Sequence, residues 1–352
     1  TVSHQLYSAM RDIIHAGGMH IGERLPASRT LARELRISRT TVINVFEILT
    51  SEGLIESRTG AGTFVSKVWM ATRPPETEVV EPLDAEQPIQ KPHLSGVITR
   101  ALDEFVDRLP HKTQAFTTAL PAFDAFPSAL WAKCVTRSWR SNHQANMGYA
   151  DPRGHFPLRQ AIASHLLSNR GIKCEAEQIF IVSGAQQAFH MIGTVLLDPE
   201  DLVWFENPGA IGASNSLIAS GATLIPVPVD QDGLVVEYGL RRAPNFRLAF
   251  VTPSHQHPLG VSMSVERRFA LLNAAKNANA FIIEDDYDGE FRYSGHPPPT
   301  LKSIDTLGRV IYVGTFSKTL FPALRLGFFL APAPLVDVFN RVSKALLQGV
   351  AS

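Results

Sequence analysis

Residues 314–327 read GTFSKTLFPALRLG, and a single lysine, Lys318, stands there between a serine and a largely apolar run. The residues that lead into this stretch, RVIYV, are β-branched or aromatic for the most part, which is typical of a buried β-strand. A buried lysine costs free energy unless it is paired or covalently bonded. The stretch therefore predicts a strand that delivers a lysine with a chemical role, and a second cation, Arg325, follows seven residues later.

Strand-like runs of the same kind recur from about residue 115 onward and alternate with helical segments. They include QIFIVSG, LVWFENP, LAFVTP and AFIIEDDYD. Alternation of apolar strands with helices predicts a mostly parallel sheet that is covered by helices on both faces. We therefore expect residues 115–352 to form an α/β domain.

The segment VSGAQQAF is a turn of small residues between a strand and a helix. The backbone N–H groups of Gly184, Ala185 and Gln186 would bind a phosphate at the N-terminus of that helix. Small residues also occur in tight turns that bind nothing, so this segment alone leaves both readings open.

The segment IIEDDYDGEF ends an apolar strand at Asp285, and Tyr287 lies two residues further on, which places both side chains on one face. A buried carboxylate needs a cationic partner, and a protonated ring nitrogen would serve. Tyr287 would then donate a hydrogen bond to a phenolate oxygen. The alternative is a solvated acidic loop.

A lysine with few charged neighbours has a lowered pKa and can bond to an aldehyde as a Schiff base, which suits Lys318. Two hydroxyls, Thr315 and Ser317, and the guanidinium of Arg325 suit a dianionic phosphate. A lysine and an arginine alone are usually structural. Together with the Asp-x-Tyr strand end, however, they predict a site for pyridoxal 5′-phosphate that is bonded to Lys318.

Residues 1–66 have a different pattern. HQLYSAMRDIIHAG, LPASRTLARELRI and SRTTVINVFEILTSEG read as three helices, the last two with Ser28 and Ser38 as N-caps. LIESRTGAGTFV reads as two strands joined by a glycine-rich turn. This order predicts an α+β winged helix-turn-helix. Residues 67–114 follow, and the five prolines between residues 74 and 92 predict a linker.

A helix-turn-helix of this kind places the first turn of its second helix in the major groove of DNA. The residues expected there are the cap and the three residues after it, Ser38, Arg39, Thr40 and Thr41. Arg29 would reach a phosphate, and Gly60 and Gly62 would let the wing approach DNA closely. Residues 1–66 carry seven arginines, no lysine and six acidic residues, a net charge of +1. Charge therefore does not distinguish DNA binding from a small interaction module.

The composition of the chain limits the class of protein it can be. Hydrophobic residues make up 45% of the chain, charged residues 19%, and the net charge is zero. The two cysteines, Cys134 and Cys174, predict neither a disulfide framework nor a metal site. No apolar run reaches the length of a membrane span and no signal peptide opens the chain, so we expect a cytoplasmic protein without a membrane partner.

Two family resemblances follow from these motifs. Leu6 to Val65, with GERLPASRTLARELRISRTTV at its centre, resembles the DNA-binding domain of the GntR family. From about residue 115, the chain is similar to the large domain of fold-type I aminotransferases. The motifs YADPRGHFPLR, SGAQQAF, ENPGA, TPSHQHPLG, EDDYDGEF and GTFSKTLFPALRLG occur in the family order. The whole chain resembles the MocR-type transcriptional regulators.

The resemblance implies roles for single residues. Asp285 would face the pyridine nitrogen and Tyr287 the ring hydroxyl, while the phosphate would be bound by Thr315, Ser317 and Arg325. Tyr149, in YADPRG, would reach the phosphate of a partner subunit, so the resemblance also implies a homodimer.

Three features depart from the family pattern. Ala210 stands where these regulators carry an aromatic residue that stacks on the cofactor. His257 stands where aminotransferases carry an asparagine, and we read it as a packing residue. The sequence ends at Ser352 within an expected helix, so the small C-terminal domain of this fold is not part of it.

These expectations combine into a pyridoxal-phosphate-dependent regulator that binds an operator with two half-sites. Its effector is the cofactor itself, or an amine or amino acid that forms an external aldimine with it, and the aminotransferase-like domain is a sensor without net turnover. One alternative is an aminotransferase with an appended DNA-binding module. Another is a DNA-binding repressor whose enzyme-like half only dimerises. The presence of Lys318, Asp285 and Arg325 together argues against the second alternative.

Overall fold

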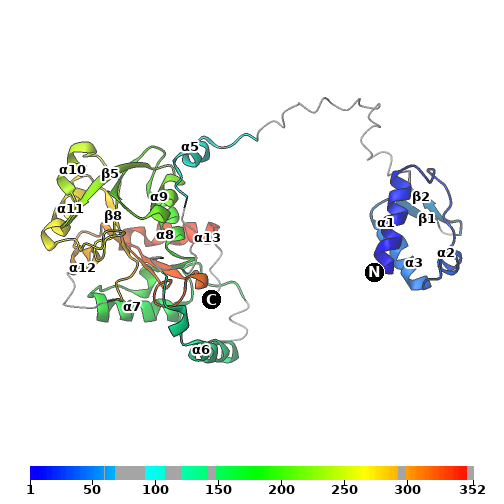
Figure 1. Ribbon diagram of the computed structural model, residues 1–352, viewed down its shortest axis with the longest axis horizontal. Helices are drawn as coiled ribbons and strands as arrows, with labels where there is room; N and C mark the ends of the chain where they lie inside the picture. Colours follow the sequence, from blue (N-terminus) through cyan, green and yellow to red (C-terminus); the bar gives the residue numbers. More distant parts are fainter. Residues whose placement is uncertain are drawn as a thin grey trace. The chain divides into compact units, whose positions relative to one another are not determined.

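The computed structural model describes residues 1–58, 60–67, 92–107, 117, 120–141, 148–291 and 299–346. The chain divides into two compact units, Thr1–Pro92 and His93–Ser352 (Figure 1). Among the helices formed by the described residues, none is long and apolar enough to cross a membrane.

The smaller unit has the predicted order of three helices and a hairpin: α1 Val2–His15, α2 Ser28–Glu34, α3 Arg39–Ser51, β1 Ile55–Arg58 and β2 Gly62–Val65. The two strands pair antiparallel, with Ile55 opposite Val65. A single core joins helices and hairpin, built on Met10, Ile14, Leu25, Val45, Leu49, Leu54, Ile55 and Val65. The apolar positions at helical spacing in the sequence thus form the faces that meet in this core.

The predicted N-caps of this unit have different outcomes. Ser38 caps α3, since its side-chain oxygen accepts a hydrogen bond from the backbone N–H of Thr41 at 3.0 Å. Ser28 does not cap α2. It is the first residue of that helix, and the capping position belongs to Ala27, whose side chain makes no capping hydrogen bond.

The larger unit is built on an eight-stranded sheet with the order β3-β10-β9-β8-β7-β4-β5-β6. The strands are β3 Ile179–Val182, β4 Leu202–Asn207, β5 Thr223–Asp230, β6 Gly233–Leu234, β7 Leu248–Val251, β8 Phe281–Asp286, β9 Val310–Thr315 and β10 Gly327–Leu330. From β5 through β4, β7 and β8 to β9 all neighbours are parallel, whereas β10 runs antiparallel between β9 and β3. The mostly parallel sheet predicted from the sequence is confirmed.

Helices cover both faces of this sheet (Figure 1). The helices of the larger unit are α5 Gly96–Glu104, α6 Ser128–Ser141, α7 Phe156–Arg170, α8 Ala185–Leu196, α9 Ile211–Ile218, α10 Val236–Arg242, α11 Val265–Asn277, α12 Leu301–Ile304 and α13 Val336–Leu346. Of these, α6 lies away from the sheet. Neighbouring residues of β7 point to opposite faces of the sheet and belong to different hydrophobic clusters. Phe250 is in the cluster with α8, α9 and α13, and Ala249 is in the cluster with α10 and α11. Burial on both faces explains why these strands read as unbroken apolar runs.

Part of the predicted linker belongs to the larger unit. Helix α5 lies within residues 67–114 and buries Ala101. After the helix, the backbone N–H and C=O of Val106 both bond the side chain of Asn215 in α9, at 3.1 and 2.9 Å. The linker prediction is therefore wrong for this segment, and residues 68–91 and 108–116 lie outside the described residues.

Candidate functional site

The residues predicted to bind a cofactor come together at one edge of the sheet. The carboxyl ends of parallel strands share an edge, and β3, β8 and β9 end there with Val182, Asp286 and Thr315. Strand β10 is antiparallel, so it begins at this edge, and Gly327 pairs with both Thr315 and Val182. The loop from β9 to β10, which carries Lys318, therefore lies beside the turn from β3 to α8.

Arg325 lies against the N-terminus of α8. Its Nη2 donates a hydrogen bond to the carbonyl oxygen of Ser183 at 3.0 Å. A Cβ atom at Gly184 would come within 3.3 Å of the guanidinium, and Gly184 has a φ of +84°, which disfavours any larger residue. A guanidinium beside the N-terminus of a helix suits an anion such as a phosphate. The predicted phosphate donor at Gly184 is not confirmed, because its backbone N–H donates to the carbonyl oxygen of Val182 at 2.8 Å.

Two hydroxyls and the lysine complete this side of the site. Thr315 Oγ1 donates to Ser317 Oγ at 3.0 Å and accepts the backbone N–H of Ser317 at 3.2 Å. These bonds fold the end of β9 into a tight turn. Lys318 follows directly, half-buried and close enough to Asp285 for its charge to oppose the rise in the pKa of that carboxyl group.

The three acidic residues at the end of β8 are buried, so the alternative of a solvated acidic loop is wrong for them. Successive side chains of a strand point to opposite faces. Glu284 accepts the backbone N–H groups of Leu301 and Lys302, both at 2.8 Å. Asp286, on the same face, accepts hydrogen bonds from Arg170 and Tyr312. Asp285 alone is turned to the opposite face.

Asp285 is a buried acid that lies close to Lys318. Its Oδ1 atom has no hydrogen-bond partner among the described residues. Burial, helped by the carboxyl groups of Glu206 and Asp288, raises the pKa of Asp285 to about 8 against the opposing charge of Lys318. A protonated pyridine nitrogen is both a hydrogen-bond donor and a cation, so this residue fits the ring of pyridoxal phosphate.

A second buried acid, Glu206, was not predicted as a site residue. It accepts hydrogen bonds from Thr252 Oγ1 at 2.6 Å, from the backbone N–H of Thr252 at 3.2 Å and from Gln256 Nε2 at 3.1 Å. Burial raises its pKa to about 7, and these hydrogen bonds oppose the rise. Gln256 Nε2 also lies 2.8 Å from the carbonyl oxygen of Pro208 and 2.9 Å from that of His257. Glu206 and Gln256 thus join the loops that follow β4 and β7.

One sequence signal could have revealed Glu206. LVWFENP, like AFIIEDD, is an apolar strand that ends in an acidic residue. Gln256 carries no such signal, because its role depends on a loop conformation that local residues do not specify.

Tyr287 lies beside these loops. The rings of Tyr287 and His257 are 5.6 Å apart and nearly perpendicular, which agrees with a packing role for His257. Burial and the neighbouring Asp288 raise the pKa of Tyr287, so its phenol stays protonated and can donate a hydrogen bond. Ala210 is half-buried against the core beside α9 and presents no ring to the site.

Tyr149 lies on the surface of the larger unit. Its side chain is 92% exposed. The turn that follows is held rigidly, because the buried Arg159 donates to Asp151 Oδ2 and to the carbonyl oxygen of Gly154, both at 3.0 Å. Tyr149 is thus exposed beside a turn that these hydrogen bonds hold.

The predicted DNA-contacting residues lie on the surface of the smaller unit. Arg29 in α2 and Arg39 and Thr40 in α3 are exposed. Thr41 is half-buried, and its hydroxyl lies 2.8 Å from Ser38 Oγ, so these two hydroxyls serve the helix cap. The wing residues Gly60 and Gly62 have φ values of +78° and +117°, which favour glycine.

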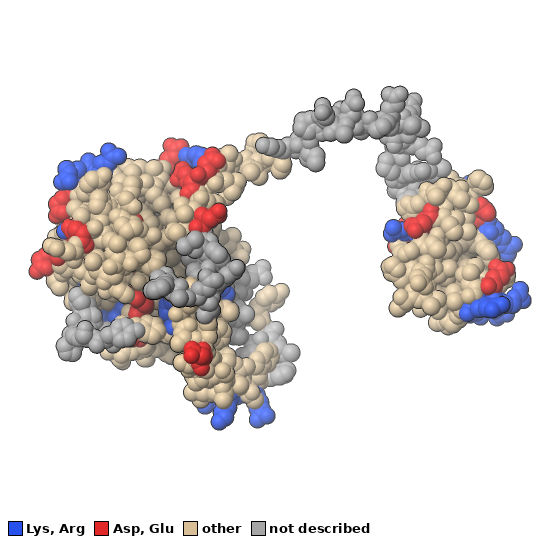
Figure 2. Space-filling model, in the orientation of Figure 1, with Lys and Arg blue, Asp and Glu red and all other residues tan. Residues whose placement is uncertain are grey.

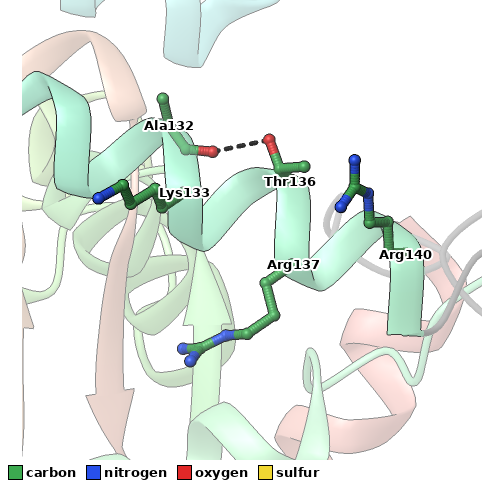
Figure 3. A pocket seen from close by; sticks show the side chains of 5 residues that line it. All are labelled: Ala132, Lys133, Thr136, Arg137 and Arg140. Carbon is green, nitrogen blue, oxygen red and sulfur yellow. Dashed lines mark hydrogen bonds between the residues drawn. The ribbon is translucent and has the colours of Figure 1, made fainter.

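A hollow of about 550 Å³ lies away from these groups, on α6 (Figure 3). It is lined by Ala132, Lys133, Thr136, Arg137 and Arg140. None of the residues predicted from the sequence lines it, so it is a surface separate from the candidate cofactor site.

Fold and site together define a winged helix-turn-helix joined to a body of the fold-type I, pyridoxal-phosphate-dependent class. Residues 2–65 match the family described as bacterial regulatory proteins, gntR family. Residues 117–348 match aminotransferase class I and II. The chain belongs to the MocR-type transcriptional regulators, which combine these two domains.

Relatives of known name agree with this family. The probable rhizopine catabolism regulatory protein MocR of Rhizobium meliloti is 43% identical over 338 residues, which cover 96% of this chain and 67% of that protein. The pyridoxine biosynthesis transcriptional regulator PdxR of Corynebacterium glutamicum is 30% identical, over 98% of this chain and 69% of that protein.

Among solved structures, the kynurenine aminotransferase of Pyrococcus horikoshii superposes with a TM-score of 0.62 at 29% identity. The match covers 74% of this chain and 65% of the aminotransferase, so this chain spans less than two thirds of that enzyme.

Proposed function

We propose that this protein is a DNA-binding transcriptional regulator that senses pyridoxal 5′-phosphate, or an amine that reacts with it. The observation that carries the proposal is the Oδ1 atom of the buried Asp285, which has no hydrogen-bond partner among the described residues. It lies at the edge of the sheet where the loop that carries Lys318 and Arg325 meets the turn from β3 to α8. A buried acid without a partner destabilises a fold unless a ligand supplies its counter-charge.

Each side chain of the site has a distinct task in this proposal. The bound cofactor supplies an aldehyde that bonds reversibly to amines. Lys318 provides the amine that holds it, and Asp285 accepts the N–H of its ring. Tyr287 donates to the ring hydroxyl. The phosphate lies at the N-terminus of α8, beside Ala185 and Gln186, and is bound together with Thr315, Ser317 and Arg325.

Regulation follows when the ligand prefers one of two arrangements of the protein. Lys318, which lies in the loop between β9 and β10, would hold the cofactor, and an amine effector would compete with it for the aldehyde. The protein acts as a homodimer in this proposal, in which Tyr149 of each subunit reaches the phosphate of the other. Two winged helices in one dimer then bind two half-sites.

An aminotransferase with an appended DNA-binding module is the second candidate. The aminotransferase-like residues of the site favour it equally, because holding the cofactor and transferring an amino group use the same Lys318 and Asp285. Turnover of an amino donor and a keto acid at about 1–10³ s⁻¹ would favour the enzyme.

The first test is to add pyridoxal phosphate to the full chain, reduce it with borohydride and map the modified lysine by mass spectrometry. We expect the label at Lys318 and its loss in Lys318→Ala, with the circular dichroism spectrum unchanged. Labelling of another lysine, equal in both proteins, would overturn the assignment.

A further inference from the structure

Two polar side chains beside Tyr287 have no task in the site as described above. His255 lies in the loop after β7, and Asp288 lies in the loop after β8. Strands β7 and β8 are parallel neighbours, so the two loops leave the sheet at the same edge. His255 Nδ1 lies 2.5 Å from Asp288 Oδ2. A carboxylate only accepts hydrogen bonds, so the imidazole is the donor and carries a proton on Nδ1.

The surface of the larger unit offers a bland explanation for such a pair. The face drawn in Figure 2 carries acidic and basic side chains in small groups of both signs. On a surface of this kind, an exposed histidine beside a carboxylate contributes little to stability. His165 and Glu290, 2.8 Å apart, form a pair of that type. The pair of His255 and Asp288 differs from it because both of its members lie against Tyr287.

Tyr287 interacts with each member of the pair in a different way. The ring of His255 is almost parallel to that of Tyr287, at an angle of 12° and with 6.3 Å between the centroids. Burial raises the pKa of the Tyr287 phenol, and the charge of Asp288 and its hydrogen bond with the phenol raise it too. The carboxylate of Asp288 thus accepts from two donors, the imidazole of His255 and the phenol of Tyr287.

The loop that carries His255 is closed by backbone hydrogen bonds. The N–H of Gln256 donates to the carbonyl oxygen of Val261 at 2.8 Å, and the N–H of Gly260 donates to that of Gln256 at 2.7 Å. Gly260 has a φ of +76°, and a Cβ atom there would come within 3.3 Å of His255 Nε2. The imidazole is therefore packed over its own loop, although 53% of its side chain is exposed.

A phenol has one proton, so Tyr287 can donate to Asp288 or to a ligand but not to both. Only 18% of the Asp288 side chain is exposed, and a carboxylate with so little access to water costs free energy when it loses its donors. We propose that His255 and Asp288 are positioning residues for Tyr287: His255 remains the donor to Asp288 when Tyr287 turns its proton to the ring hydroxyl of the cofactor. The proposal rests on the function proposed above, in which Tyr287 binds that hydroxyl.

The test is a titration of the full chain with pyridoxal phosphate, followed by the visible absorption of the bound cofactor. His255→Phe keeps a ring beside Tyr287 but removes the N–H group. His255→Asn removes the ring but keeps an N–H group near the place of Nδ1. His165→Phe is the control, since it breaks the similar pair with Glu290. Circular dichroism checks the fold of each variant.

We expect His255→Phe to lower the affinity for pyridoxal phosphate about threefold to tenfold, the effect of about one hydrogen bond, and to shift the absorption maximum. His255→Asn and His165→Phe should stay within about twofold of the native chain. Equal losses in His255→Phe and His255→Asn would overturn the proposal, because the ring and not its N–H group would then matter. Native affinity in His255→Phe would overturn it as well.

The same substitution in two other backgrounds tests whether His255 acts through its neighbours. Tyr287→Phe has no phenol proton to direct, and Asp288→Ala has no carboxylate that competes for it. Adding His255→Phe to either variant should therefore change the affinity by less than about twofold. A further loss of about threefold to tenfold in either background would show that His255 acts independently of that neighbour and would overturn the proposal. A native chain that binds no pyridoxal phosphate would instead contradict the proposed function.

Discussion

Replacing Asp285 by asparagine should make the cofactor-free protein more stable and at the same time weaken its hold on the cofactor. Asparagine has nearly the same shape as aspartate but cannot carry a charge. Burial raises the pKa of Asp285 from 3.8 to about 8, so the protonated acid stabilises the fold. That contribution is complete below about pH 4 and is lost as the pH rises through about 8.

The size of the effect follows from the shift. About four pH units at about 1.4 kcal/mol each set an upper limit of about 6 kcal/mol. Relaxation of the loops and penetration of water reduce the penalty, and we expect the native chain to lose about 1–3 kcal/mol more than Asp285→Asn between about pH 5 and pH 8. Glu206, whose pKa is raised to about 7, adds a pH dependence that both proteins share.

Urea unfolding of the cofactor-free chain, followed by circular dichroism at several pH values, measures this difference. Asp103→Asn, at an exposed position of α5, is the control and should follow the native chain. Affinity for pyridoxal phosphate should fall at least about tenfold in Asp285→Asn, a difference of about 1.4 kcal/mol. Parallel pH profiles for all three proteins, together with cofactor affinities within about twofold, would refute the role of Asp285.

Three further perturbations test other parts of the site and the DNA surface. Glu206→Gln places an NH₂ group among the donors of Thr252 and Gln256, so we expect a loss of about 1–3 kcal/mol in the free energy of unfolding, with Thr223→Ser on β5 as an unaffected control. Arg39→Ala should lower affinity for the preferred DNA by about 1–3 kcal/mol in a mobility-shift assay, and an equal loss on all sequences would make Arg39 a phosphate contact. Inserting about 5 bp between two half-sites should weaken binding sharply, and affinity that ignores the insertion would contradict the dimeric arrangement.

The sequence predicted those parts of the fold that depend on local pattern. Continuous apolar runs marked the strands of the sheet, and the polar residues after them marked the edge where Asp285, Thr315 and Arg325 meet. The prediction succeeded there because parallel strands deliver their carboxyl ends to a common edge whatever the details of the loops. Similarly, Ser38 in the sequence predicted where α3 of the smaller unit begins, and it is the N-cap of that helix.

Contacts between distant segments were not predictable in this way. Because residues 74–92 are rich in proline, the sequence predicted a linker that also included α5. The segment after this helix is held by Asn215, more than a hundred residues away in the sequence. The Gln256 side chain donates hydrogen bonds to Glu206 and to two backbone carbonyl oxygens. These bonds depend on a loop conformation that composition does not determine. From the sequence, the acidic residues at the end of β8 were as compatible with a solvated loop as with a buried site. Asp286 is buried because Arg170 and Tyr312, which lie on other elements, donate hydrogen bonds to it.

The most direct test of the central claim is the affinity of the full chain for its preferred DNA, with and without pyridoxal phosphate. That DNA can be selected from a pool of random duplexes by the chain itself. Saturating pyridoxal phosphate should change the affinity of the native chain at least about fivefold, about 1 kcal/mol of coupling, and leave Lys318→Ala unchanged. A native chain that holds the cofactor on Lys318 yet binds this DNA with the same affinity in both states would contradict the claim.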